Sequence, residues 1–208
     1  MRSSQKAMPL TPEECGSMDR LNFFAVVNYL ANPIAKFVDE LRRELTPDCP
    51  HRAHVTVLPP RALAVPAGEA IRDCERLLAN VEPFEMRLGS VDLFESTQVI
   101  KLSFASGVPR LKELHDLLAA SKMAGIENFE FIPHITLGQD LPAGRVEEYL
   151  AMARRKWEAF KPAPPLLVEN LTFVQQTIDG CWLDLAEIEL GRREPVGVLN
   201  SGAGRRIS

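Results

Sequence analysis

The sequence predicts a mixed α+β protein with antiparallel strand pairs, and not a doubly wound parallel sheet. Short apolar segments typical of buried strands alternate along the chain with segments whose apolar residues recur at helical spacing. Two strand pairs joined by turns, one near the middle of the chain and one near its end, are typical of α+β folds. The order strand, helix, strand, helix occurs twice and indicates a weak internal repeat.

The first half of the chain contains one of these repeats. Its expected elements are a strand at 21–30, a helix at 33–45, a strand at 54–58 and a helix at 67–80. Asn32 and Pro33 favour the start of the first helix, because asparagine is a good N-cap and proline fits the first helical position.

The second half contains the other repeat. Its expected elements are hairpin strands at 84–94 and 99–104, a helix at 109–121, a strand at 131–138, a helix at 143–159 and closing hairpin strands at 166–176 and 181–190. Gly89 falls where the alternation of the first hairpin strand changes phase, which predicts a bulge. Asp179-Gly180 predicts the turn of the closing hairpin.

Composition narrows the class of protein. The 208 residues carry a formal net charge of −4, whereas a protein that grips long nucleic acid by its phosphates has a basic surface. A short oligonucleotide or a nucleotide in a local pocket remains compatible with this charge. The four cysteines form no C-x-x-C pair, and no apolar segment has the length of a membrane span. We therefore expect a reduced cytoplasmic protein without a membrane partner.

Two short segments share an unusual pattern. His-x-Thr-x, with apolar residues at both x positions, occurs at 54–57 and again at 134–137. Side chains alternate between faces along a strand, so the His and the Thr of each copy share one face. Two such copies among four histidines arise by chance in only about 1–2% of sequences. The duplication indicates that both segments face one polar site.

A pair of imidazoles suits acid–base catalysis. One histidine can remove a proton from an attacking water or hydroxyl while the other protonates the leaving oxygen. The hydroxyls of Thr56 and Thr136 can donate to phosphate oxygens or orient the water. The pattern therefore favours a phosphodiester as the ligand.

Other sites are less favoured by the residues. A metal site would need His-x-His or His-x-Asp/Glu, because threonine is a poor zinc ligand, and no Gly-x-Ser-x-Gly nucleophile elbow is present. His51 and His115 are expected at the surface and Arg61 in a solvated loop. Gln175 and Gln176 are more simply explained as strand residues than as residues of the cleft.

These motifs resemble the signature of the two-histidine (2H) phosphoesterase superfamily, in particular of bacterial proteins named 2′-5′ RNA ligase or RNA 2′,3′-cyclic phosphodiesterase. That signature is two copies of His-h-Thr-h, where h is hydrophobic. The second copy also has the usual proline before its histidine, Pro133. The resemblance spans residues 21–191 as one domain, with an N-terminal extension at 1–20 and a C-terminal tail at 192–208.

The resemblance implies two α+β lobes related by a pseudo-twofold axis, with the active-site groove between them. It implies that His54 and His134 are the catalytic pair and that Thr56 and Thr136 bind substrate. No metal or cofactor is expected, and the implied partners are RNA ends or nucleotides with a cyclic phosphate, handled by a monomer. Two alternatives remain open: a binding module that holds such a ligand without turnover, and a scaffold in which the two motifs are accidental.

Overall fold

The structure is a computed structural model that describes residues 19–127, 129–142 and 144–192. Its strands are β1 Arg20–Tyr29, β2 His54–Arg61, β3 Phe84–Phe94, β4 Val99–Ser106, β5 Ile135–Gly138, β6 Leu166–Val168, β7 Asn170–Thr177 and β8 Trp182–Glu189. Its helices are α1 Ile34–Leu45, α2 Ala67–Leu78, α3 Val108–Ala119 and α4 Val146–Phe160. No helix in these ranges is long and apolar enough to cross a membrane. The predicted terminal extension and tail fall almost wholly outside the described residues.

The strands form two antiparallel sheets of four strands, which confirms the predicted α+β class. One sheet has the order β2-β1-β7-β8 and the other β5-β4-β3-β6. The units β1-α1-β2-α2 and β4-α3-β5-α4 have the same order of elements, and the last strand of each unit lies at the edge of its sheet. The internal repeat is therefore a pair of lobes related by an approximate twofold axis.

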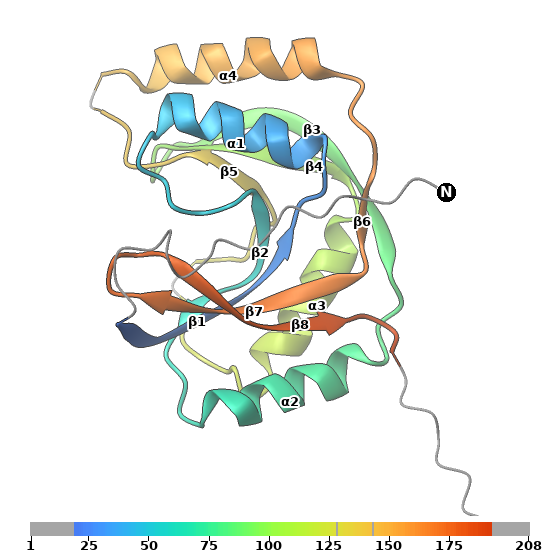
Figure 1. Ribbon diagram of the computed structural model, residues 1–208. Helices are drawn as coiled ribbons and strands as arrows, with labels where there is room; N and C mark the ends of the chain where they lie inside the picture. The colour runs from blue at the N-terminus through green and yellow to red at the C-terminus, as the bar shows by residue number, and fades with distance from the viewer. Residues whose placement is uncertain (1–18, 128, 143, 193–208) are drawn as a thin grey trace, which may run out of the picture.

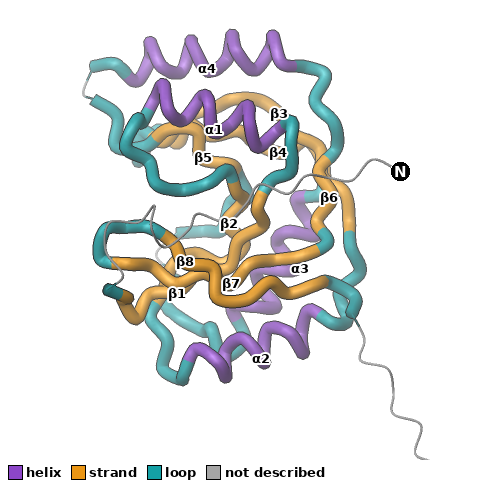
Figure 2. Tube along the Cα trace, viewed as in Figure 1, coloured by secondary structure: helices purple, strands orange, loops and turns teal. Residues whose placement is uncertain are grey.

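The helices are exchanged between the lobes. Helix α1 connects two strands of the first sheet but packs beside β5 of the second, and α3 connects two strands of the second sheet but packs beside β2 of the first. Figure 1 shows α1 and α4 together over one sheet, with α2 and α3 on the opposite side of the molecule. The path of the backbone through these exchanges can be followed in Figure 2. Both lobes consequently share one continuous apolar core.

The closing hairpin differs from its prediction. The apolar segment expected as one strand at 166–176 is split, because β6 pairs with β3 whereas β7 pairs with β1 and β8. A continuous apolar run cannot reveal that the chain passes from one sheet to the other within it. The Asp-Gly turn is confirmed, with Gly180 at a φ of 78° between β7 and β8. The bulge near Gly89 is also confirmed as a register shift between β3 and β4.

Two side chains expected in solvent are buried. The Nδ1 atom of His115 on α3 lies 2.9 Å from the Val57 carbonyl oxygen of β2, and its Nε2 atom lies 3.0 Å from the Glu127 carboxylate. Arg61, at the end of β2, donates to the same carboxylate at 2.5 Å. His115 also stacks on Phe131, with ring centroids 3.9 Å apart. These polar groups are buried because they link α3 to the edge of the opposite sheet, a long-range contact that sequence periodicity does not show.

Gly107 lies at a closely packed point of the second lobe, so a substitution there measures how tight the packing is. It precedes α3 at a φ of 88°, and an added Cβ would lie 2.7 Å from Cγ of Met86. We expect Gly107→Ala to lower the free energy of unfolding by about 2–4 kcal/mol, as the sum of backbone strain and a steric clash. Gly180→Ala is the matched control, since it has a similar φ of 78° and no atom within 4 Å of the added Cβ. If urea unfolding shows the same decrease in the free energy of unfolding for both variants, this account is contradicted.

Candidate active site

The two His-x-Thr segments meet at the edges of the two sheets. In the described part of the chain β2 pairs only with β1 and β5 only with β4, and β2 and β5 lie beside each other between the lobes. The predicted alternation is confirmed: the apolar motif residues have no exposed surface, whereas both threonines are half-buried. The fully buried residues are Val55, Val57, Ile135 and Leu137. The polar side of each motif is therefore directed away from the core.

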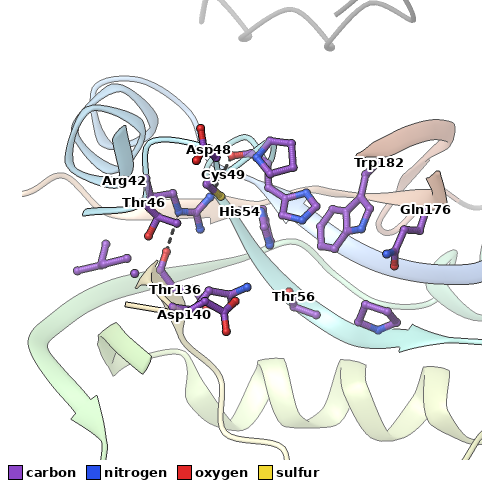
Figure 3. A pocket seen from close by; sticks show the side chains of 16 residues that line it. Arg42, Thr46, Asp48, Cys49, His54, Thr56, Thr136, Asp140, Gln176 and Trp182 are labelled. Atoms are coloured by element: carbon purple, nitrogen blue, oxygen red, sulfur yellow. Dashed lines mark hydrogen bonds between the residues drawn. The ribbon is translucent and has the colours of Figure 1, made fainter. Parts of the chain in front are cut away.

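A cavity of about 420 Å³ lies over this junction. Three of the four predicted site residues line it, namely His54, Thr56 and Thr136. Figure 3 shows them with a wall formed by Trp182 and Gln176 on one side of His54 and a group that includes Arg42 and Thr136 on the other. The cavity has the size of a small-molecule site.

His134 is not among the residues that line this cavity, although Thr136, two residues later, is one of them. His134 immediately precedes β5, so the strand begins one residue later than the predicted catalytic residue. Its ring stands edge-on to Phe94, with ring centroids 4.9 Å apart. A positive charge on His134 would repel one on His54, and this repulsion is the smallest of the causes that lower the pKa of His54.

Both imidazoles are held in the same way by the backbone. Nδ1 of His54 lies 2.6 Å from the Arg52 carbonyl oxygen, and Nδ1 of His134 lies 2.7 Å from the Ile132 carbonyl oxygen. A carbonyl only accepts hydrogen bonds, so each Nδ1 carries the hydrogen and the neutral ring has its lone pair on Nε2. Each ring therefore presents Nε2 as the atom that exchanges a proton with a ligand.

The carbonyl that orients His54 is itself fixed by its own side chain. The Arg52 guanidinium donates to the Asp184 carboxylate at 2.6 Å and lies 3.6 Å from the centroid of the Tyr29 ring. The Tyr29 hydroxyl donates to the same carboxylate at 2.8 Å. These contacts connect β1, β8 and the loop before β2, and they restrict the backbone at residue 52.

Arg42 joins the two motif segments. This residue of α1 is 5% exposed, and its Nε atom donates to the Thr136 carbonyl oxygen of β5 at 2.8 Å. Its Nη1 atom donates to the carbonyl oxygens of His51 and Arg52, at 3.3 and 3.0 Å. One buried guanidinium thus bonds to the backbone on both sides of the junction. A charged hydrogen bond of this kind is stronger than a neutral one.

Burial keeps the histidines of the site neutral. Loss of solvent, followed by repulsion from Arg42, holds the pKa of His54 well below its usual range. Loss of solvent also lowers the pKa of His134, with smaller contributions from Lys101 and Arg42. Loss of solvent, followed by repulsion from Arg42, lowers the pKa of His51 to about 4. His51 also lines the cavity. At neutral pH the unliganded site therefore contains imidazoles that can accept protons.

Sequence reasoning missed several of the residues that build this cavity. The burial of Arg42 could have been predicted from the sequence, because this residue lies one helical turn after Val38 within the buried stripe of α1. His51 and Gln176, which were set aside, both line the cavity, and so does Trp182. Gln176 on β7 and Trp182 on β8 face each other, and only the pairing of these strands brings the two residues close to β2.

The comparisons with known proteins agree with the fold. The sequence profile of the 2′-5′ RNA ligase superfamily matches residues 30–179. The chain therefore belongs to the 2′-5′ RNA ligase superfamily.

Several relatives are distant in sequence but match over nearly their full length. A protein of Geobacillus thermodenitrificans named "Putative phosphoesterase" is 22% identical over 181 residues, which cover 83% of this chain and 99% of the relative. Crystalline E. coli LigT complexed with 3′-AMP has a TM-score of 0.53 and 19% identity, over 83% of this chain and 98% of that one. A conserved Agrobacterium tumefaciens protein of unknown function has a TM-score of 0.51 and 14% identity, over 88% and 95% of the two chains. The structural matches establish the shared fold.

The role of Arg42 can be measured through stability. We expect Arg42→Met to lower the free energy of unfolding by about 3 kcal/mol, because three backbone carbonyls lose their charged donor. The neighbouring Arg43 is exposed, so Arg43→Met should change the free energy by less than about 0.5 kcal/mol. Urea unfolding of both variants tests this difference, and similar stabilities would contradict the bridging role.

His51 should make stability depend on pH. Its pKa of about 4 in the folded chain lies below the ordinary 6.5 of the unfolded chain, so between these values the unfolded state binds more protons. The contribution of His51 to the free energy of unfolding is complete above pH 6.5 and is lost as the pH falls toward 4. Between pH 7 and pH 4.5, His51→Gln should therefore lose about 2 kcal/mol less unfolding free energy than the unaltered chain. The same pH dependence in both proteins would exclude His51 as its source.

Proposed function

We propose that this protein is a metal-independent phosphodiesterase that hydrolyses 2′,3′-cyclic phosphates, or related cyclic or 2′-5′ phosphodiesters, of RNA ends or nucleotides. The observation that carries the proposal is the junction of β2 and β5, where His54, Thr56 and Thr136 line one cavity and both motif imidazoles have their lone pair on Nε2. Membership in the 2′-5′ RNA ligase superfamily supports it. E. coli LigT, which shares the fold, has been crystallised with 3′-AMP, ATP and NADP+.

The two histidines take complementary roles in this reaction. His54 is the more deeply buried ring, and its lowered pKa leaves Nε2 unprotonated at neutral pH, as the general base requires. His134 is half-buried and nearer to solvent, which suits the general acid, because this ring has to take up a proton before each turnover. An anionic phosphate raises the pKa of an adjacent imidazole, so substrate binding favours the protonated form of His134.

Each proton and bond is accounted for by these groups. A water oxygen attacks phosphorus while its proton passes to Nε2 of His54. The bond from phosphorus to one ribose oxygen breaks, and that oxygen takes the proton from Nε2 of His134. The Thr56 and Thr136 hydroxyls donate to the non-bridging oxygens, whose charge increases in the transition state. After product leaves, proton exchange with solvent restores both rings.

The proposal is tested by replacing each histidine with an uncharged residue of similar shape. We expect His54→Gln and His134→Gln each to lower kcat for adenosine 2′,3′-cyclic monophosphate by at least about 100-fold, since each loses one proton transfer. Thr56→Val and Thr136→Val should each lower kcat by about tenfold. Hydrolysis is followed by chromatography of the monophosphate product.

Three controls accompany this assay. The urea midpoint of each variant shows that it is folded, and EDTA should leave the activity of the unaltered chain unchanged. Full turnover in both histidine variants would contradict the proposal. Tight binding of the cyclic nucleotide by the unaltered chain, without any product, would instead support a binding module.

A further inference from the structure

The cavity has one wall suited to a nucleobase. Trp182 and Gln176 lie directly opposite each other on β8 and β7 and both line the cavity with His54. The indole is half-buried, and the Gln176 amide has no hydrogen-bond partner among the described residues. An aromatic face stacks on a base, and a free amide both donates to and accepts from its edge. The centroid of the indole lies 4.8 Å from that of the His54 ring, so this wall adjoins the reacting centre.

The charges around the cavity limit what else can bind. Among the described residues that line it, Arg42 is the permanent cation, and two of its nitrogens already bond to backbone carbonyls. Asp48 and Asp140 line the side of the cavity next to Arg42 and Thr136, and Figure 3 shows their carboxylates there. Both residues are exposed, and neither carboxylate has an ion-pair or hydrogen-bond partner in the described part of the chain.

These features disfavour ligands with several phosphates. A cyclic phosphodiester carries one negative charge, which a single buried guanidinium and two threonine hydroxyls can accommodate. A second phosphate in reach of Asp48 and Asp140 meets two uncompensated carboxylates, and such repulsion extends over roughly one Debye length, about 8 Å at physiological salt. A protein that holds a chain of phosphates has the opposite arrangement, with several cations along a groove.

We infer that the cavity selects nucleoside 2′,3′-cyclic monophosphates over RNA ends and over nucleotides with additional phosphates. Trp182 and Gln176 hold the base, and the carboxylates of Asp48 and Asp140 exclude further negative charge. This inference rests on the proposed function and names the substrate class within it.

Two substrates that differ by one phosphate test the charge selection. The first is adenosine 2′,3′-cyclic monophosphate, and the second is the same nucleotide with a 5′-phosphate. We expect kcat/KM to be about tenfold higher for the first, and the ratio to fall about threefold in 0.5 M salt. The double variant Asp48→Asn/Asp140→Asn should lower the ratio to about 2, whereas Asp179→Asn, an exposed acid outside the cavity, should leave it unchanged.

A third substrate without a base tests the aromatic wall. Trp182→Ala should lower kcat/KM about tenfold more for the adenosine substrate than for ribose 2,3-cyclic phosphate, and Trp182→Phe should restore most of this difference. Equal losses on both substrates would mean that the indole only supports His54, which would overturn its role in base binding.

The outcomes also separate this inference from the proposed function. Higher kcat/KM for the 5′-phosphorylated nucleotide, or for a pentanucleotide RNA with a 2′,3′-cyclic end, overturns the selectivity while hydrolysis itself stands. A protein that hydrolyses none of these compounds contradicts the proposed function. In that case the ratio of Kd values for the same two nucleotides, measured by calorimetry, decides the selectivity: a ratio near 1 overturns it.

Discussion

The site depends on one buried guanidinium. Arg42 extends from α1 and bonds to backbone oxygens of β5 and of the loop before β2, so a single side chain fixes the spacing of the two sheet edges. Its charge also repels protons from the nearby imidazoles, which couples the geometry of the junction to the protonation of the site. On the other side of the molecule His115 of α3 contacts the β2 edge in a similar way, but through an imidazole and a carboxylate. The approximate symmetry of the lobes thus includes the polar contacts that join them.

The two motif histidines are equivalent in backbone contact and different in surroundings. Each ring bonds through Nδ1 to the carbonyl two residues before it, as expected for copies of one motif. Trp182 and His51 surround His54, whereas Phe94 contacts the half-exposed ring of His134. A symmetric backbone therefore supports two environments of different polarity, and such a difference separates the proton affinities of an acid–base pair.

The fold class and the positions of the two motifs could be predicted from the sequence, because both depend on local patterns of residues. Alternation along a strand predicted that His54 and Thr56 share a face, and the burial of Val55 and Val57 confirmed it. The split of the predicted strand at 166–176, the burial of His115 and the contribution of Trp182 all depend on pairing between distant segments. Periodicity contains no information on such pairing. Arg42 lies between these cases, since an arginine within an apolar helical stripe indicates a buried polar contact but not its partner.

The exchange of α1 and α3 between the lobes has a consequence for how the molecule moves. Each sheet is covered by a helix whose flanking strands belong to the other sheet, so neither lobe has a complete core by itself. Domain closure of the hinge type needs two bodies that remain folded while they rotate, and the core shared by the described residues offers no such division. The two sides of the groove are therefore held together by one shared core and not joined by a hinge.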